Sequence, residues 1–271
     1  MKLIRPQPTY DVNDVPVYGK VRFTSGSTDF LDSPNAMEFP RKSGGFLQSL
    51  GHGIVARVAF HEDNEATGRD LDGSDEYQKT STVSIKYHNG KGWSSAFMEL
   101  PDEEASFELV KAGYKKNKNN RELAIPRSEP LVAKLIGLAE EAGRVRPVFK
   151  ARSLQLSTKQ SRGHSEYGSN SDIIAIVGNA EIAELNAAYL QKRQREHGFL
   201  YDLTESEVES ELKGKKDQAL IRPVGLGGNN YFDIGDINAD DDFNYYGRAR
   251  GVVHGAREIP LETKVAEVSR A

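Results

Sequence analysis

Five cationic side chains crowd into eleven residues near the middle of this 271-residue chain. The run of residues 111–121 also holds one aromatic ring and three asparagines. Lysine and arginine displace condensed counterions from phosphates, and a tyrosine ring can stack on an unpaired base. These residue types predict a nucleic-acid-binding segment that favours single strands. The expected contact residues are Lys111, Tyr114, Lys115, Lys116, Lys118 and Arg121.

A second group of cations follows in a stretch that we expect to be extended, Val145–Leu156. In a strand, side chains of the same parity share one face. The cations that would share it are Arg144, Arg146, Lys150 and Arg152. Their span, about 26 Å at the rise of a strand, could follow several phosphates. The alternative is a surface that is only solvated, or that the chain's own carboxylates neutralise.

The distribution of charge supports this reading more than the total does. The net charge is −4, yet residues 111–162 carry 13 basic and 4 acidic side chains. The segments on either side, 1–110 and 163–271, are both acidic. Segregated charge of this size produces a strong local field, which a polyanion would meet first at the basic segment.

An acidic loop at residues 233–244 is the second candidate site. Hard divalent cations take oxygen ligands, and alternate side chains of a tight loop can converge on one ion. The residues that fit this spacing, as ligands for Ca²⁺ or Mg²⁺, are Asp236, Asn238, Asp240 and Asn244. The sequence Gly-Asp-x-Asn-x-Asp resembles the calcium loop of dockerin and EF-hand modules over about a dozen residues. It departs from that pattern at Asp241, where glycine is usual, and at Gly247, where the bidentate acid is expected.

The same loop suggests a catalytic alternative, a metal-dependent phosphodiesterase or nuclease. Carboxylates that hold Mg²⁺ against a scissile phosphate would be Asp233, Asp236, Asp240 and Asp242. The chain contains no reaction-specific motif, so our first expectation is a non-catalytic protein that requires no cofactor. A third possibility is a structural assembly subunit of a viral or multiprotein particle, in which basic and acidic faces of neighbouring copies join.

Composition narrows the class of protein. The chain has no cysteine, which excludes a disulfide scaffold, a thiolate nucleophile and cysteine-based metal sites. It has no apolar run of the length that a signal peptide or a membrane span requires. We therefore expect a cytoplasmic protein with no membrane partner.

The elements that must position these residues read as an α+β fold, with an antiparallel, β-rich first part and a mixed second part. Strands are expected at Val15–Phe23 and Gly53–Phe60, where branched and aromatic residues alternate with other types. A hairpin joins Thr82–Tyr87 to Trp93–Leu100 through an Asn-Gly turn. Two long loops, Thr24–Gly45 and Glu62–Lys79, separate the strands.

About three helices are expected in the second part. Their start and stop signals bound segments at residues 128–143, 182–197 and 204–212, the last with a Thr-x-x-Glu capping box. The apolar run Ile173–Val177 predicts a short strand. We place a boundary between parts at 1–107 and 108–271, with one continuous domain as the alternative.

Overall fold

The computed structural model describes residues 9–67, 77–149, 152–156, 165–193, 195–227 and 237–253, with side chains left out for 61–67. These residues form seven helices and twelve strands, which confirms the α+β class but not the expected number of helices. Among them, no single helix is long and apolar enough to cross a membrane, and one bent pair passes that test by length and composition together.

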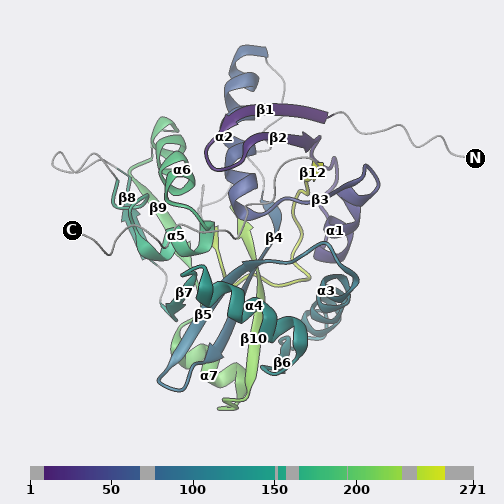
Figure 1. Cartoon of the computed structure of the whole chain (residues 1–271), viewed down its shortest axis with the longest axis vertical. Helices are drawn as coiled ribbons and strands as arrows, with labels where there is room; N and C mark the ends of the chain where they lie inside the picture. Colours follow the sequence, from purple (N-terminus) through teal and green to yellow (C-terminus); the bar gives the residue numbers. More distant parts are fainter. Residues whose placement is uncertain are drawn as a thin grey trace, which may run out of the picture.

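A small sheet combines the two ends of the described chain (Figure 1). Its order is β1 (Thr9–Val15), β2 (Gly19–Thr24), β12 (Gly251–Val253) and β3 (Gly45–Leu47). All its pairings are antiparallel. The expected strand Val15–Phe23 is therefore the end of one strand, a turn and most of the next.

A larger, mixed sheet forms the centre of the molecule. Its order is β7 (Val145–Pro147), β5 (Trp93–Glu99), β4 (Gln78–His88), β10 (Gln218–Leu226), β11 (Ile237–Asn238), β9 (His197–Tyr201) and β8 (Arg152–Gln155), with β6 (Ala124–Pro126) also on β10. Only the β9–β11 pair is parallel. Strands from before and after residue 107 pair in both sheets, and the boundary at that residue stays a prediction.

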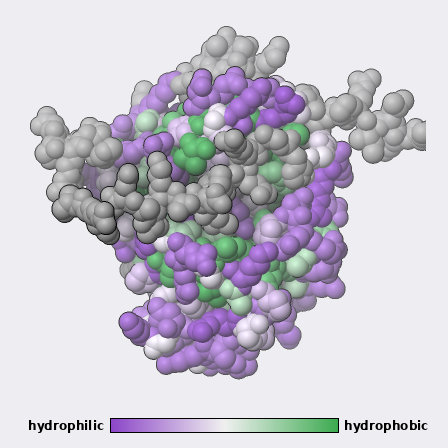
Figure 2. All heavy atoms as spheres, in the orientation of Figure 1, coloured by the Kyte–Doolittle hydropathy of each residue, from purple (hydrophilic) through white to green (hydrophobic). Residues whose placement is uncertain are grey.

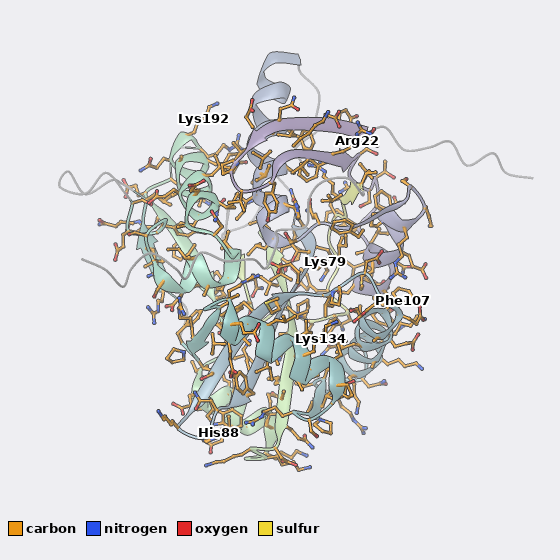
Figure 3. All side chains as sticks on the ribbon, in the orientation of Figure 1. Arg22, Lys79, His88, Phe107, Lys134 and Lys192 are labelled. Carbon is orange, nitrogen blue, oxygen red and sulfur yellow. The ribbon has the colours of Figure 1, made fainter. Side chains whose placement is uncertain are left out.

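The expected hairpin is confirmed as β4 and β5. Its turn is held by Asn89, whose Oδ1 accepts hydrogen bonds from the backbone of Lys91 and Gly92 at 2.9 and 3.0 Å. Gly90 has a φ of 98°, a left-handed conformation that glycine adopts without a steric penalty. His88, labelled in Figure 3, marks this end of the sheet.

The two faces of β4 differ in chemistry because side chains alternate across a strand. Val83, Ile85 and Tyr87 face an apolar core that includes residues of α1 (Ser33–Arg41), α3 (Glu104–Asn117) and α4 (Pro130–Glu141). The opposite face carries the polar residues Ser84 and Lys86, both buried. This polar face becomes important below.

Three further helices build a second core beside the small sheet. They are α2 (Leu50–Thr67), α5 (Ser171–Val177) and α6 (Ala180–Lys192). The seventh helix, α7 (Glu205–Leu212), packs Val208 and Leu212 against Trp93 and Leu220.

Four expectations for local structure are wrong in whole or in part. Gly53–Phe60 lies in α2, and Ile173–Val177 forms α5. Both segments are buried on nearly all sides, and a helix that is apolar all round shows no period that separates it from a buried strand. The loop Thr24–Gly45 contains α1, which begins after Asp32, whose carboxylate accepts a hydrogen bond from the backbone of Asn35 at 3.0 Å. In the expected loop Glu62–Lys79, α2 continues to Thr67, β4 begins at Gln78, and residues 68–76 lie outside the description.

The three expected helices are confirmed with adjusted ends. In α4 the N-cap is Glu129, which bonds the backbone of Val132 at 2.9 Å, and not Ser128. The second helix, α6, ends at Lys192, before the strand that starts at His197. The capping box of α7 is formed as expected by Thr204 and Glu207.

Candidate functional site

The basic segment 111–121 forms the second half of α3 and the turn that follows it. Phe107, Val110, Gly113 and Asn117 are buried at intervals of three or four residues, so the positions between them face solvent. The cations among those positions are all exposed, and Tyr114 is half-buried beside them. Figure 2 shows a mainly hydrophilic surface, interrupted by a few more apolar residues, on the side of the molecule where Figure 1 places α3. We call this set the basic α3 face: Lys111, Tyr114, Lys115, Lys116, Lys118 and Arg121.

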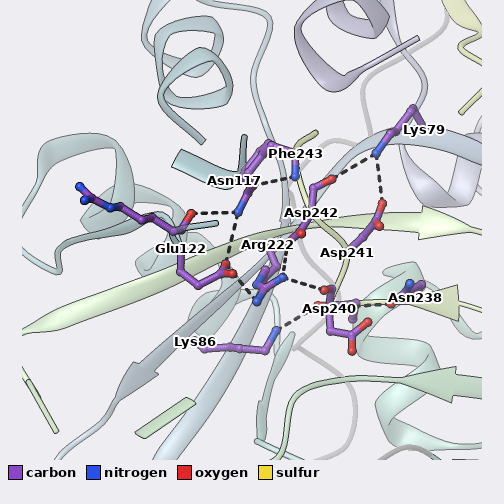
Figure 4. A network of polar contacts seen from close by, with 12 residues as sticks. Lys79, Lys86, Asn117, Glu122, Arg222, Asn238, Asp240, Asp241, Asp242 and Phe243 are labelled. Carbon is purple, nitrogen blue, oxygen red and sulfur yellow. Dashed lines mark hydrogen bonds and ion pairs between the residues drawn. The ribbon is translucent and has the colours of Figure 1, made fainter. Parts of the chain in front are cut away.

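Two contacts fix the position of this helix. Gly113 lies against the ring of Phe243, so closely that a Cβ at this position would be 2.3 Å from Cδ2 of the ring. Asn117 accepts a hydrogen bond from the backbone of Phe243 at 2.9 Å and donates to the carbonyl of Arg121 at 3.2 Å (Figure 4). Phe243 of the acidic loop therefore holds in place the helix that carries the basic α3 face.

Most cations on this face have no acidic partner. Lys111 bonds Glu108 at 2.8 Å, and the Lys118 ammonium lies 5.6 Å from the centre of the Tyr114 ring. Within the described ranges, no ion pair joins Lys115, Lys116, Lys118 or Arg121 to a carboxylate. Cations in the last turn also stabilise the helix dipole, a role that leaves them available to a ligand.

The structure differs from expectation in the second group of cations. Val145–Leu156 is not one strand: β7 pairs with β5, whereas β8 pairs with β9 at the other edge of the sheet. Arg146 donates to the backbone carbonyls of Gly143, Val145 and Ser171, and Arg152 pairs with Asp172 at 2.9 Å. Lys150 lies outside the described residues. The cations expected along one face of a strand thus do not form a continuous exposed surface.

Arg144 belongs to the interior. Its guanidinium contacts both carboxylate oxygens of Glu99, at 2.7 and 3.0 Å, and the carbonyls of Ala175 and Ile176, both at 2.9 Å. Burial opposes ionisation of Glu99, but the Arg144 charge outweighs it and holds the pKa of Glu99 below its ordinary value. Every strong donor of Arg144 is engaged, so it has none left for a phosphate.

The acidic loop is engaged with the chain's own cations in its described part, residues 237–244. Asp241 accepts from Lys79 at 3.1 Å and from the Tyr77 hydroxyl at 2.6 Å, and Asp242 bonds Arg222. Lys79, labelled in Figure 3, lies in the middle of the molecule. Neither Asp241 nor Asp242 therefore presents a free carboxylate to a metal ion.

The expected metal ligands are only partly described. Asn238 accepts a hydrogen bond from the backbone of Asp240 at 3.1 Å, and Asn244 is half-buried. Asp236 and Asp233 lie outside the described residues. In the part of the chain that is described, no group of three or more histidine, aspartate or glutamate side chains could hold a metal ion. A Ca²⁺ or Mg²⁺ site in this loop stays a prediction.

A buried charge network lies beneath the loop, on the polar face of β4 and β10 (Figure 4). Arg222 pairs with Glu122 at 3.0 Å, and Lys86 pairs with Asp202 at 2.6 Å with neither side chain exposed. Burial raises the pKa of Glu122, Asp202 and Asp240 and lowers that of Lys86.

Four of these residues, Lys86, Glu122, Asp202 and Arg222, are not among those that the sequence predicts for a site. The available signal is a cation that directly follows an isoleucine within a strand: Lys86 after Ile85, and Arg222 after Ile221. A charge at such a position needs a partner, but nothing in the sequence identifies Asp202, more than a hundred residues away, as that partner.

Comparison with known proteins indicates the fold of this chain but not its function. No family model matches the chain, and no curated protein sequence matches it. A solved structure described as "Accommodation of massive sequence variation in Nanoarchaeota by the C-type lectin fold" aligns with a TM-score of 0.55, covering 93% of this chain and all of that one. The identity is 12%, so the likeness concerns the fold alone. This chain is an α+β protein similar in architecture to the C-type lectin fold.

Proposed function

We propose that this chain is a non-catalytic nucleic-acid-binding protein that contacts phosphates through the basic α3 face. The observation that carries the proposal is the group of four exposed cations, Lys115, Lys116, Lys118 and Arg121, without carboxylate partners among the described residues. Exposed cations can displace the counterions condensed on the phosphates of a polyanion, and that release favours binding.

The spacing on the helix supports the proposal. Lys111, Lys115 and Lys118 are four and three residues apart, so they lie along one side of α3. They span about 10 Å at the rise of an α-helix, a length that neighbouring phosphates of one strand can match. Tyr114 lies within the same set, where its ring could stack on an unpaired base.

The cations at 144–152 no longer belong to the proposed surface. Arg144 is buried, and Arg146 and Arg152 bond groups of the chain itself, so we expect their loss to act on stability more than on affinity. The binding surface is therefore smaller than the sequence indicated, and we expect correspondingly modest affinity.

A charge-matched pair of triple variants tests the assignment. One replaces Lys115, Lys116 and Lys118 with Gln; the control replaces three exposed lysines on other elements, Lys91, Lys134 and Lys215, with Gln. Both remove three charges, so a general field effect would weaken both equally. We expect the first to lose at least about tenfold in affinity for a labelled single-stranded oligonucleotide at low salt, and the control to lose little. Equal losses would reject the α3 site.

The same experiment separates the rival hypotheses. Mg²⁺-stimulated cleavage of the oligonucleotide, lost on Asp240→Ala, would support the phosphodiesterase. Salt-sensitive self-association without oligonucleotide binding would support the assembly subunit.

A second candidate function comes from the fold. The structural neighbour is described in terms of massive sequence variation accommodated by the C-type lectin fold, and this chain resembles it over 93% of its length. By analogy, this chain would be a binding scaffold whose exposed residues vary. Its two large cores are compatible with this, because they place stability in the interior. Randomising the exposed residues Phe30, Tyr245 and Tyr246 should then leave the melting temperature nearly unchanged, and a collective loss of folding would reject the idea.

A further inference from the structure

Lys86 and Asp202 form the most deeply buried ion pair among the described residues. The side chains are 0% exposed, and Nζ of Lys86 lies 2.6 Å from Oδ1 of Asp202. The other contacts of Nζ are Oγ of Ser84 at 2.8 Å and the carbonyl of Ala239 at 3.0 Å. Oδ2 of Asp202 accepts from Ser95 at 3.2 Å. An amine and a carboxyl group are thus held together where water does not reach.

Strand register explains this placement. Ser84 and Lys86 share one face of β4, and Ser95 of β5 is directly opposite Lys86. Asp202 follows the last residue of β9, and Ala239 follows the last residue of β11, the parallel neighbour of β9. Residues in or directly after four strands of one sheet therefore bring the pair together.

The geometry points to a covalent modification site: Lys86 and Asp202 condense within the folded chain to an isopeptide bond. The carboxyl carbon of Asp202 is one bond beyond the oxygen that Lys86 contacts. It is therefore close to the separation of about 3–3.5 Å from which a held nucleophile attacks. Holding the two groups in this way makes the condensation a unimolecular step.

The step balances without an oxidant, a metal or a cofactor. A proton passes from the ammonium to the carboxylate along the hydrogen bond, giving a neutral amine and a carboxylic acid. The amine lone pair then forms a C–N bond to Cγ of Asp202. One carboxyl oxygen leaves with its own proton and one proton from the amine, as water, and an amide N–H remains.

Burial favours both the neutral pair and the product. Desolvation lowers the pKa of Lys86 and raises that of Asp202, and each change favours the reactive form. Two buried charges are replaced by one neutral amide, which removes their desolvation cost. The polar groups at hand, Ser84, Ser95 and the Ala239 carbonyl, can hydrogen-bond the new amide.

Intact-mass spectrometry of the full purified chain, unfolded in acid, tests the proposal directly. We expect a mass lower than that of the sequence by one water, and a branched peptide that joins the segments around residues 86 and 202 after digestion. The readout needs no variant, so a folding defect cannot obscure it. A chain at full mass after prolonged incubation in the folded state would overturn the proposal.

Variants locate the bond. Lys86→Gln and Asp202→Ala should keep full mass, whereas Asp202→Asn should lose ammonia in place of water.

The second buried pair is the matched control. Lys79 and Asp241 are 2% and 5% exposed and 3.1 Å apart, and Tyr77 donates to the same carboxylate oxygen as Lys79. This pair is wider apart than Lys86 and Asp202, at 3.1 Å against 2.6 Å, and it is slightly exposed, so we expect no bond there. An Asp-Gly pair such as Asp72-Gly73 can also lose one water, by cyclisation of the aspartate onto the backbone. If peptide mapping placed the lost water there, or at Lys79 and Asp241, the assignment to Lys86 would be overturned.

Discussion

Gly113 has no side chain at the point where α3 meets Phe243, and that contact decides where the basic α3 face lies. A Cβ would be 2.3 Å from the ring, a distance that neither the helix nor a buried aromatic ring can absorb without moving. We predict that Gly113→Ala lowers the free energy of unfolding by about 1–3 kcal/mol, the usual cost of overpacking a core. Chemical denaturation measures this.

Gly137 on α4 is the control for that substitution. Its Cβ would meet nothing within 4 Å. Alanine is the better helix former, so Gly137→Ala should raise stability by about 0.5–1 kcal/mol. If both substitutions raised stability, helix propensity and not the Phe243 contact would explain the result.

A second prediction at this scale concerns His52, which is buried against Tyr18 with ring centres 4.2 Å apart. Its Nδ1 lies 2.8 Å from the Ser49 hydroxyl. Burial lowers the pKa of His52 from 6.5 to about 4, and Glu99 opposes the change only in part. Below pH 6.5 the unfolded chain therefore binds a proton that the folded chain does not.

Stability should accordingly fall as the pH drops from about 6.5 to about 4, and this contribution should level off below that. The loss from His52 is at most about 3 kcal/mol. Denaturant titrations at several pH values in the wild type and in His52→Gln isolate it, because other acids titrate in both. Parallel pH profiles for the two proteins would contradict the assignment.

At the scale of elements, some parts of the fold follow from local rules. The Asn-Gly hairpin and the capping box of α7 are sequence-local devices, so the sequence predicts them correctly. The start of α2 and all of α5 are buried on nearly every side, and their apolar runs do not distinguish helix from strand. The small sheet could not be predicted, because it pairs residues near both ends of the chain.

The same distinction between local features and distant partners applies to the candidate site. The exposed cations of α3 are visible in the sequence because a solvated cluster needs no distant partner. The cations at 144–152 are misread for the opposite reason: their partners, Glu99 and Asp172, come from other elements. Charge alone in a sequence does not show whether a cation faces solvent or a buried carboxylate.

Arg144 provides the test of that distinction. Arg144→Met should leave Glu99 half-enclosed without its cation and lower the free energy of unfolding by about 3–5 kcal/mol. Adding Glu99→Met should recover part of the loss, and a double-mutant cycle measures the coupling. Nucleic-acid affinity per folded molecule should not change. A loss of affinity equal to that of the Lys115, Lys116 and Lys118 triple variant would show that Arg144 contributes to binding after all.

At the scale of the whole molecule, the proposed binding depends on how positive charge is divided between the interior and the surface. Four cations of the interior, Lys79, Lys86, Arg144 and Arg222, are matched to carboxylates. In contrast, four of the five cations on the basic α3 face pair with no carboxylate among the described residues. A protein with a net charge of −4 can still bind a polyanion if its free positive charge is gathered in one place.

The dependence of binding on salt tests this claim most directly. Affinity of the wild-type chain for a single-stranded oligonucleotide should be measurable near 50 mM salt and should fall as salt rises. The slope of log K against log salt should be about −0.7 for each phosphate neutralised, giving roughly −2 to −4 for three to five contacts. No binding at low salt, or binding that salt does not weaken, would contradict the account.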